Sequence, residues 1–502
     1  MNYMRPTDEQ QVAIDAAKAG KTLKFQAGAG CGKSATLNEI ARAMPDKRIL
    51  CVVYNKSVRQ ELMRKMPKNV MVHTNHSYAR SMLLNRWGRH LDRINGNRQN
   101  AKVQADILDQ VGPVRINSDT VLTPAARARL AMGAVLAWCK SADLELGPEH
   151  IPTPLGIGKA EDIQRLREVI LPVADKARAD IRSANGRLKW QHDYYLKMAQ
   201  LMLARSDRQT LPFDVVMMDE CQDVNPVAAS LYLDMQTLLQ RIIVGDSAQA
   251  INGWNGAIDI LGTFPADESL FLSKSFRFGP AIAEEANKWL TLLGAPLRLH
   301  GHEPVGSTVG PIERPDAVLC RTNAAAMGQV FDILDKNGTP ALVGGGSEIA
   351  SLAMAAEMLK KGTLTDHPDL CAFANWAELQ DYVEQDPLGQ DLKVFVELVD
   401  SHGVEKIKDA AFRVKDAEQA GPGDTIVCTS HKSKGLEWHD VRVANDFRQP
   451  NPNTGMTGET PVNREELMLS YVTVTRAMKR LDRGSLAWID QHVRGRRHLA
   501  VA

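Results

Sequence analysis

The chain has 502 residues, of which 44% are hydrophobic, and its formal net charge is +1 at pH 7. At roughly 150 residues per domain, this length predicts about three or four domains with sizeable cores. A net charge so close to zero excludes a global positive field, so binding of nucleic acid would depend on local basic patches. The seven cysteines form no C-x-x-C pair, which favours reduced thiols over disulfides or zinc.

No run of the sequence approaches the roughly 20 apolar residues of a membrane span. The first ten residues contain no apolar signal core either. We therefore expect a soluble, cytoplasmic protein of a bacterial or phage-infected cell, or a nuclear one if the source is eukaryotic, with no membrane partner.

Residues 1–79 alternate apolar runs with amphipathic segments, which predicts a parallel sheet covered by helices. The runs lie at 23–25, 49–54 and 70–72, and the segments at 9–17 and 57–66.

The first apolar run leads into FQAGAGCGKS, residues 25–34, and a helix-compatible segment follows. A strand, a glycine turn and a helix N-terminus are the context of a phosphate-binding loop. In that role Lys33 would reach the phosphates and Ser34 would hold Mg²⁺. Ala27 stands where the usual pattern has its first glycine. The alternative is a glycine-rich turn that binds nothing. The predicted nucleotide contacts are Ala27, Gly28, Ala29, Gly30, Cys31, Gly32, Lys33 and Ser34.

Between residues 80 and 210 the apolar residues recur at helical spacing, most clearly at 125–139 and 160–181. The start of this region, 80–102, is rich in arginine. It is either a solvated helix face or a surface that follows a phosphate backbone.

The α/β pattern returns with an apolar strand at 215–218, which ends in the acid pair Asp219 and Glu220. Asp219 is placed to hold a nucleotide's Mg²⁺, and Glu220 to orient or deprotonate an attacking water. The next strand, 241–244, runs toward Gln249, which is suited to sensing a γ-phosphate. Trp254 beyond it either packs or stacks on an unpaired base.

Further strands are predicted at 317–320, 341–343, 425–428 and 441–444, and helices at 464–478 and after Pro280. The stretch 347–421 reads as helical and acidic. Arg277 follows a strand and Arg476 lies near the C-terminus, and either could act on a γ-phosphate as an arginine finger. The sequence thus predicts two α/β cores, each interrupted by a mostly helical insertion.

The ordered set of motifs resembles superfamily 1A helicases of the UvrD/Rep type, and is particularly similar to the compact F-box DNA helicase branch and its phage and bacterial relatives. The matching stretches are TDEQQVAI, AGAGCGKS, VVYNKSVRQEL, HTNHSYA, DECQD, VGDSAQAINGWNGA, SFRFGPAIA, LCRTN, SHKSKGLEW and EELMLSYVTVTRA. The resemblance implies two RecA-like P-loop cores with ATP and Mg²⁺ between them.

The resemblance also implies individual roles. Gln10 takes the adenine-reading position, Phe276 the adenine-stacking position and Glu437 the ribose-binding position. Arg277 and Arg476 take the positions of the two arginine fingers. The catalytic residues would be Lys33, Glu220, Gln249, Arg277 and Arg476, and the metal ligands Ser34 and Asp219. Contacts to DNA would come from Tyr54, Asn55, Thr74, His76, Trp254 and His431.

The expected domains follow the same pattern. Residues 1–79 and 211–265 would form the first core, with 80–210 as its helical insertion. Residues 266–346 and 422–502 would form the second core, with 347–421 as a small helical insertion. The family usually has a tyrosine and an arginine beside Trp254, where this chain has Asn252 and Asn255.

The function expected from this resemblance is an ATP-dependent DNA helicase that moves on single-stranded DNA, 3′ to 5′, with single strands and single/double-strand junctions as partners. Two alternatives stay open. One is a translocase that strips proteins from single-stranded DNA with little unwinding. The other is an ATP-gated binding module without enzymatic activity.

Overall fold

The computed structural model of the chain divides into two compact units. The first consists of residues 1–26, 33–247 and 252–271, and the second of residues 27–32, 248–251 and 272–502. The residues that the structure describes are 5–95, 99–118, 120–154, 157–206, 210–253, 256–363, 365, 367, 370, 373, 375–385, 390–449 and 463–491. The loop 27–32 groups with the second unit, although the strand before it and the helix after it belong to the first.

A six-stranded sheet forms the centre of the first unit, in the order β3-β2-β6-β7-β1-β8. Adjacent strands from β3 to β1 pair in parallel. Its strands are β1 (Leu23–Ala27), β2 (Ile49–Val53), β3 (Val70–Thr74), β6 (Val215–Met218), β7 (Gln240–Gly245) and β8 (Glu268–Leu272). Helix α1 (Asp8–Lys18) precedes β1, and α2 (Lys33–Arg42), α3 (Lys56–Lys65) and α9 (Pro226–Tyr232) lie in the connections between strands.

The composition of the central strands explains their place in this sheet. Every residue of β2 (ILCVV) and of β6 (VVMM) is buried, as expected for strands that are covered on both faces. The carboxyl ends of parallel strands meet at one edge of a sheet, which is the ligand-binding edge of open α/β folds. The loop after β1 and the acid pair after β6 therefore belong to the same edge.

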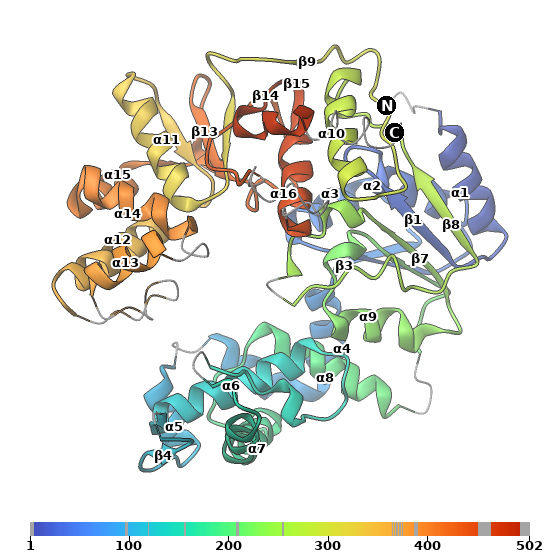
Figure 1. Ribbon diagram of the computed structural model, residues 1–502. Helices are drawn as coiled ribbons and strands as arrows, with labels where there is room; N and C mark the ends of the chain where they lie inside the picture. Colours follow the sequence, from blue (N-terminus) through green and yellow to red (C-terminus); the bar gives the residue numbers. More distant parts are fainter. Residues whose placement is uncertain are drawn as a thin grey trace, which may run out of the picture. The chain divides into compact units, whose positions relative to one another are not determined.

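The helical segment of the first unit comprises α4 (Asn75–Asp92), α5 (Ala101–Ile107), α6 (Pro124–Lys140), α7 (Ala160–Arg182) and α8 (His192–Ala204), with a small hairpin of β4 (Val114–Arg115) and β5 (Val121–Leu122). Figure 1 shows α4 to α8 as a group beside the sheet of their own unit. Their buried side chains, including Trp138 and Leu166, are continuous with the core around Leu50 and Val52 of β2. The helices predicted near 125–139 and 160–181 are confirmed.

A seven-stranded sheet forms the second unit, in the order β12-β11-β13-β10-β14-β15-β9. All its pairings are parallel. Its strands are β9 (Thr308–Val309), β10 (Ala317–Cys320), β11 (Pro340–Leu342), β12 (Lys415–Asp416), β13 (Thr425–Thr429), β14 (Trp438–Val443) and β15 (Ala477–Asp482). The predicted α/β class with parallel sheets in two cores is confirmed.

The helices of the second unit are α10 (Pro280–Leu292), α11 (Asn323–Asp335), α12 (Ser347–Lys360), α13 (Trp376–Gln385), α14 (Gln390–His402), α15 (Val404–Arg413) and α16 (Arg464–Val474). Figure 1 shows α12 to α15 together on one side of β13, and α10 and α16 on the other.

Several predicted elements of the second unit differ in their boundaries from the observed ones, including the strand expected over 341–343, which is β11 at Pro340–Leu342. The helix expected over 464–478 ends at Val474, and Ala477 begins strand β15. The Arg476 carbonyl accepts a hydrogen bond from Trp438 N, so the chain leaves the helix to join the sheet. The strand expected over 441–444 begins earlier, at Trp438, and ends at Val443.

In the part of the chain that the structure describes, we find no helix with the length and apolarity that crossing a bilayer requires.

Candidate active site and nucleic-acid interface

The glycine loop after β1 has the backbone geometry that its sequence requires. Gly30 and Gly32 have φ angles of +73° and +75°, which side chains with a Cβ rarely adopt. A Cβ on Gly30 would also lie 2.5 Å from the Cβ of Arg277. Helix α2 begins at Lys33, so the loop leads directly into a helix N-terminus, a favourable place for a phosphate.

A cation, a hydroxyl and two carboxylates lie together in the first unit. Ser34 Oγ donates a hydrogen bond to Asp219 Oδ2 at 2.7 Å, and Lys33 Nζ lies 3.3 Å from Glu220 Oε1. Gln222 Nε2 donates to Glu220 Oε2 at 2.6 Å. The side chains predicted from the loop AGAGCGKS and from the stretch DECQD are therefore in direct contact with each other.

The acid pair has an unusual backbone and an unusual charge balance. Glu220 has φ +53° and ψ +44°, a left-handed conformation that is uncommon outside glycine and is often found at functional sites. Burial and the Glu220 charge raise the pKa of Asp219 to about 6, against the opposite effect of Lys33 and Ser34. A nearby cation stabilises the charged form of a carboxylate whose pKa is raised in this way. Its oxygen, with the Ser34 hydroxyl, is the hard donor type that Mg²⁺ prefers.

The second unit brings together Gln249, Arg277, Glu437 and Arg476. Arg277 Nε lies 2.6 Å from Glu437 Oε2, and its Nη1 donates to the Thr475 carbonyl at 3.1 Å. Arg476 is buried, and its Nη2 lies 3.4 Å from Gln249 Oε1. The two predicted fingers are thus neighbours through Thr475, which links one to the other.

Backbone carbonyls of α16 and of the turn before β14 also fix the Arg476 guanidinium. Nε donates to the Val472 carbonyl at 2.9 Å, one turn earlier in α16, and Nη1 donates to the Leu436 carbonyl at 3.2 Å. Nη2 donates to Thr475 Oγ1 as well, at 3.2 Å. This side chain is held by acceptors of its own unit before any ligand is considered.

Several hydrogen bonds within the second unit hold the backbone of loop 27–32, among them one from Gly28 N to the Leu272 carbonyl at 3.2 Å. Ala29 N donates to the hydroxyl of Tyr471 at 3.2 Å, and Ser275 Oγ donates to the Ala29 carbonyl at 2.9 Å. Phe276 N donates to the Gly30 carbonyl at 2.8 Å. The sequence reasoning missed Tyr471 and Ser275. Both lie in quoted motifs, five residues and two residues before the predicted fingers, which was the available signal.

The residues predicted to bind the base lie in different units. Gln10 is buried in the first unit, where its Oε1 accepts from Thr7 N at 3.0 Å and its Nε2 donates to Thr36 Oγ1 at 3.0 Å. Phe276 belongs to the second unit and is half-buried, with the His302 ring 5.7 Å away. Part of the Phe276 ring therefore stays accessible for stacking.

Two of the predicted DNA contacts cap helices. Thr74 caps α4 in a capping box with Ser77, and Asn55 Oδ1 accepts from Val58 N at 2.8 Å at the start of α3. Capping satisfies backbone N–H groups that a helix start leaves without partners. These side chains therefore have a structural role whether or not they touch DNA.

The other predicted DNA contacts have varied surroundings. His76 Nε2 lies 3.3 Å from Asp193 Oδ1 of α8, and its ring meets the edge of Tyr195. Tyr54 is 46% exposed, and burial together with Asp223 and Glu220 raises its pKa. His431 is half-buried in the turn after β13. Trp254 lies outside the described residues.

Comparison with known proteins agrees with the motifs. Residues 10–255 match the family model described as an AAA domain. The chain is 28% identical over 510 residues to F-box DNA helicase protein 1 of Schizosaccharomyces pombe, covering 95% of this chain and 57% of the relative. It is 25% identical over 520 residues to F-box DNA helicase 1 of Gallus gallus, covering 95% of this chain and 49% of the relative. The resemblance to the superfamily 1A helicases is confirmed. The chain spans about half the length of the curated relatives it matches.

The structure shows the surroundings of one of the two residues that differ from the UvrD/Rep pattern. Asn252 stands where these helicases usually have a tyrosine, and its Nδ2 donates to Asp223 Oδ1 at 3.0 Å. The amide thus binds the acidic stretch after β6. The second departure, Asn255, lies outside the described residues, as does its neighbour Trp254.

Proposed function

We propose that this chain is an ATP-dependent DNA helicase that moves on single-stranded DNA, 3′ to 5′, and unwinds duplex from single/double-strand junctions. The observation that carries the proposal is the contact set of Lys33, Ser34, Asp219 and Glu220 at the carboxyl edge of a parallel sheet. The relatives named as DNA helicases support DNA as the substrate. The direction of movement rests on the UvrD/Rep resemblance.

In this proposal the residues of the first unit bind and orient the substrate phosphates. Lys33 would leave Glu220 and pair with the phosphate oxygens, which frees the Glu220 carboxylate to accept a proton from the attacking water. Ser34 and Asp219 would hold Mg²⁺, which when bound supplies positive charge against the phosphate oxygens. Gln10 and the loop amides would fix the nucleotide's position.

The second unit would supply positive charge as negative charge develops on the γ-phosphate. Arg277 and Arg476 take this role, and Gln249 would report the state of the phosphate. Phe276 would stack on the base and Glu437 would bind the ribose. Alternation between a nucleotide-bound and a free state would change the grip on a single strand through Tyr54, Asn55, Thr74, His76, Trp254 and His431.

The test is ATP hydrolysis with and without single-stranded DNA. We expect stimulation by DNA in the unmodified chain, and a loss of about 10²–10³-fold in kcat for Lys33→Ala, because a charge contact to the transition state is removed. Lys21→Ala is the matched control, since Lys21 pairs with Glu268 on the surface of the same unit and lies outside the predicted nucleotide site. Full activity of Lys33→Ala, or no effect of DNA, would contradict the proposal.

A second candidate is a translocase that strips proteins from single-stranded DNA and unwinds poorly. The Asn252–Asp223 hydrogen bond favours it, because an amide tied to a carboxylate offers no aromatic platform for a base. Displacement of a bound protein without strand separation would identify this activity. Measurable turnover of ATP would exclude a binding module without enzymatic activity.

A further inference from the structure

A pocket of about 520 Å³ lies inside the helical segment of the first unit. Its lining includes Trp87 of α4, Arg182 at the end of α7, and Met198, Met202 and Arg205 on or just after α8. Pockets of roughly 300–1,000 Å³ hold small ligands in proteins. None of these residues has a role in the nucleotide site or strand path proposed above.

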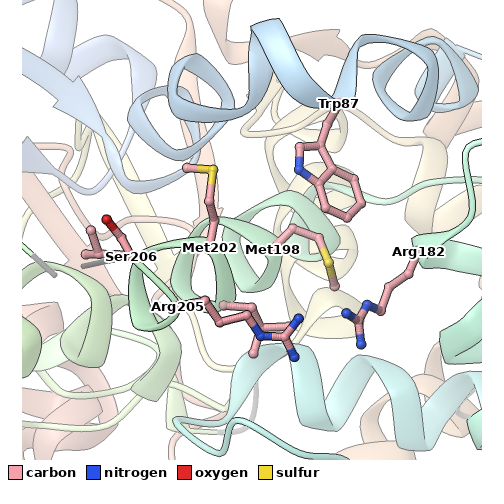
Figure 2. Close-up of a pocket in the computed structure, with 8 residues that line it drawn as sticks. Trp87, Arg182, Met198, Met202, Arg205 and Ser206 are labelled. Atoms are coloured by element: carbon pink, nitrogen blue, oxygen red, sulfur yellow. The ribbon is translucent and has the colours of Figure 1, made fainter. Parts of the chain in front are cut away.

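The pocket has chemically distinct sides. Figure 2 shows the Trp87 indole above the pocket, the Met198 thioether between the indole and the guanidinium groups, the Met202 thioether to the left at the level of the indole, and both guanidinium groups on the side opposite α4. Met198 is nearly fully buried, so it forms a fixed part of the floor. An aromatic and thioether wall thus faces a cationic wall across one concavity.

The cationic wall carries positive charge that its surroundings do not balance. Among the described residues, neither the Arg182 nor the Arg205 side chain has an ion-pair partner. The nearby Glu145 carboxylate is paired with Arg178 at 2.8 Å. Burial lowers the pKa of Arg182, and the charges of Arg205 and Arg178 lower it further. An anion between the two guanidinium groups would relieve this repulsion.

The aromatic wall has an unused donor. Trp87 interrupts α4 with a non-helical conformation, φ −123° and ψ 22°. Its ring contacts His90, with centroids 4.5 Å apart, and Trp190 at 6.0 Å. Its buried Nε1–H has no hydrogen-bond partner among the described residues. The protein covers this N–H, so the part of Trp87 that is open to a ligand is its half-buried ring and not the donor.

We propose that this pocket binds one nucleotide unit of a single DNA strand, with its phosphate between Arg182 and Arg205 and its base against Trp87 and Met198. Guanidinium groups bind phosphate oxygens in a two-pronged geometry, and aromatic faces stack on bases of any sequence. Thioethers also pack favourably on aromatic rings. A base inside a duplex cannot enter a concavity, so the bound unit is unstacked.

This inference rests on the proposed function, because it takes DNA as the ligand. It adds a second contact point for the strand. On α4, Trp87 lies about three helical turns beyond His76, the last proposed contact of the first unit on that helix. The guanidinium groups of this contact come from α7 and from just after α8. The exposed arginines of α4 that the structure describes, in the arginine-rich start of the helical segment, do not line the pocket.

The test is equilibrium binding of a fluorescein-labelled oligothymidylate to the full chain without ATP, followed by anisotropy over a series of salt concentrations. We expect Arg182→Gln with Arg205→Gln to weaken binding about tenfold or more, and to reduce the salt slope by about one to two, because phosphate contacts are lost. Arg129→Gln with Arg165→Gln removes the same charge from exposed positions of α6 and α7, outside the arginine-rich stretch 80–102, and should change affinity less than about twofold.

Trp87 gives an independent arm of the same test. Trp87→Phe keeps a stacking face and should bind more tightly than Trp87→Leu, which should lose about tenfold. An oligonucleotide with 5-iododeoxyuridine should crosslink to the peptide that carries Trp87. Circular dichroism and thermal unfolding of each variant show whether the helical segment still folds, and crosslinking of the unmodified chain keeps the test decisive if a variant does not.

Three outcomes would overturn the proposal. The pocket variant and its charge-matched control could bind the oligonucleotide with equal affinity, or the crosslinks could form only with other peptides. The chain could also bind an acidic peptide and no oligonucleotide. Thymidine monophosphate as competitor separates the two sources of a nucleotide. If thymidine monophosphate displaces the oligonucleotide only weakly, the ligand is a unit of a strand. If it displaces the oligonucleotide at an equal concentration of nucleotide units, the ligand is a free nucleotide and the proposal is overturned. The proposed function fails separately, if the unmodified chain shows no DNA-stimulated ATP hydrolysis.

Discussion

Lys197 shows how a single buried charge is accommodated in the helical segment. Its ammonium donates to the carbonyls of Ser141 and Asp143, at 2.9 and 2.8 Å, and to Gln200 Oε1 at 2.7 Å. It also lies 5.2 Å from the centre of the Trp138 ring. These groups satisfy all three N–H donors of an ammonium inside the core. Burial lowers the pKa of Lys197 to about 8, against the charges of Cys139 and Asp143, which raise it.

This lowered pKa predicts a pH dependence of stability. Lysine in an unfolded chain has a pKa near 10.4, so above about pH 8 the unfolded state binds more protons than the folded state. The free energy of unfolding should therefore gain a contribution from Lys197 as pH rises from about 8 to about 9.5. Urea denaturation of the unmodified chain and of Lys197→Met, which cannot titrate, should differ in slope against pH. Lys176→Met, at an exposed position, should leave the slope unchanged, and parallel profiles for Lys197→Met would refute the assignment.

Tyr471 predicts a second effect at the scale of one atom. Its hydroxyl accepts from Ala29 N, and both residues are buried. Tyr471→Phe leaves that N–H without this acceptor and should cost about 1–3 kcal/mol in the free energy of unfolding. It should also raise the KM for ATP, because the loop backbone loses a support.

Tyr194→Phe is the matched control for this loss of a hydroxyl. The Tyr194 hydroxyl is buried and has no partner among the described residues, so its removal should be neutral or stabilising. Chemical denaturation and ATP titrations of the two variants measure the difference. Equal behaviour of both variants would show that the bond to Ala29 N contributes nothing.

Individual residues were predictable from the sequence where a local pattern defines them. Lys33, Ser34, Asp219 and Glu220 belong to short motifs with a fixed context of strand and turn, and the structure brings them into contact. The pocket around Trp87 had no such signal. Arg182 and Arg205 lie about one hundred residues beyond Trp87 in the sequence, and only the packing of α4, α7 and α8 joins them.

At the scale of elements, helix starts have clear sequence signals and helix ends do not. Thr7, Thr74 and Thr123 each accept a hydrogen bond from a backbone N–H at a helix start. The end of α16 was misplaced because the sequence after Val474 continues with residues that a helix tolerates. The parallel pairing of β15 with β14 decides this end, and that pairing is a long-range contact.

The cap of α4 gives a prediction that separates packing from DNA binding. Thr74→Ala should lower the free energy of unfolding by about 0.5–2 kcal/mol, while Thr74→Ser should keep the cap and the stability. If Thr74 also contacts DNA through its hydroxyl, Thr74→Ser should keep the affinity for oligothymidylate. Thr74→Ala should then lower this affinity by more than Asn100→Ala does. Asn100→Ala removes a comparable cap at the start of α5. Denaturation and anisotropy measure the two effects, and unchanged stability of Thr74→Ala would contradict the capping role.

For the whole molecule, the class of fold was predictable because two runs of alternating strands and helices appear in the sequence. The grouping of loop 27–32 with the second unit was not, because it depends on Ser275, Phe276 and Tyr471 reaching that loop across the chain. The predicted division into two cores with two helical insertions stays a prediction.

The direction of movement is a property of the complete chain and gives its own prediction. Partial duplexes with a 3′ tail should be unwound in an ATP-dependent reaction, and those with only a 5′ tail should not, if the chain moves 3′ to 5′ along the strand it grips. Strand separation measured by loss of a quenched fluorophore tests this. A blunt duplex and the Lys33→Ala chain are the controls, and preferential unwinding from the 5′ tail would reverse the proposed direction.

The ion pair of Arg277 with Glu437 has a thermodynamic consequence for any nucleotide that recruits this arginine. Arg277 must leave Glu437 before it can bind a phosphate. At a given moment, therefore, only a fraction of the molecules have an Arg277 that is free to bind the nucleotide. The observed dissociation constant then equals the intrinsic one divided by that fraction. Because Glu437 is about half exposed, solvent screens the pair and the penalty is small.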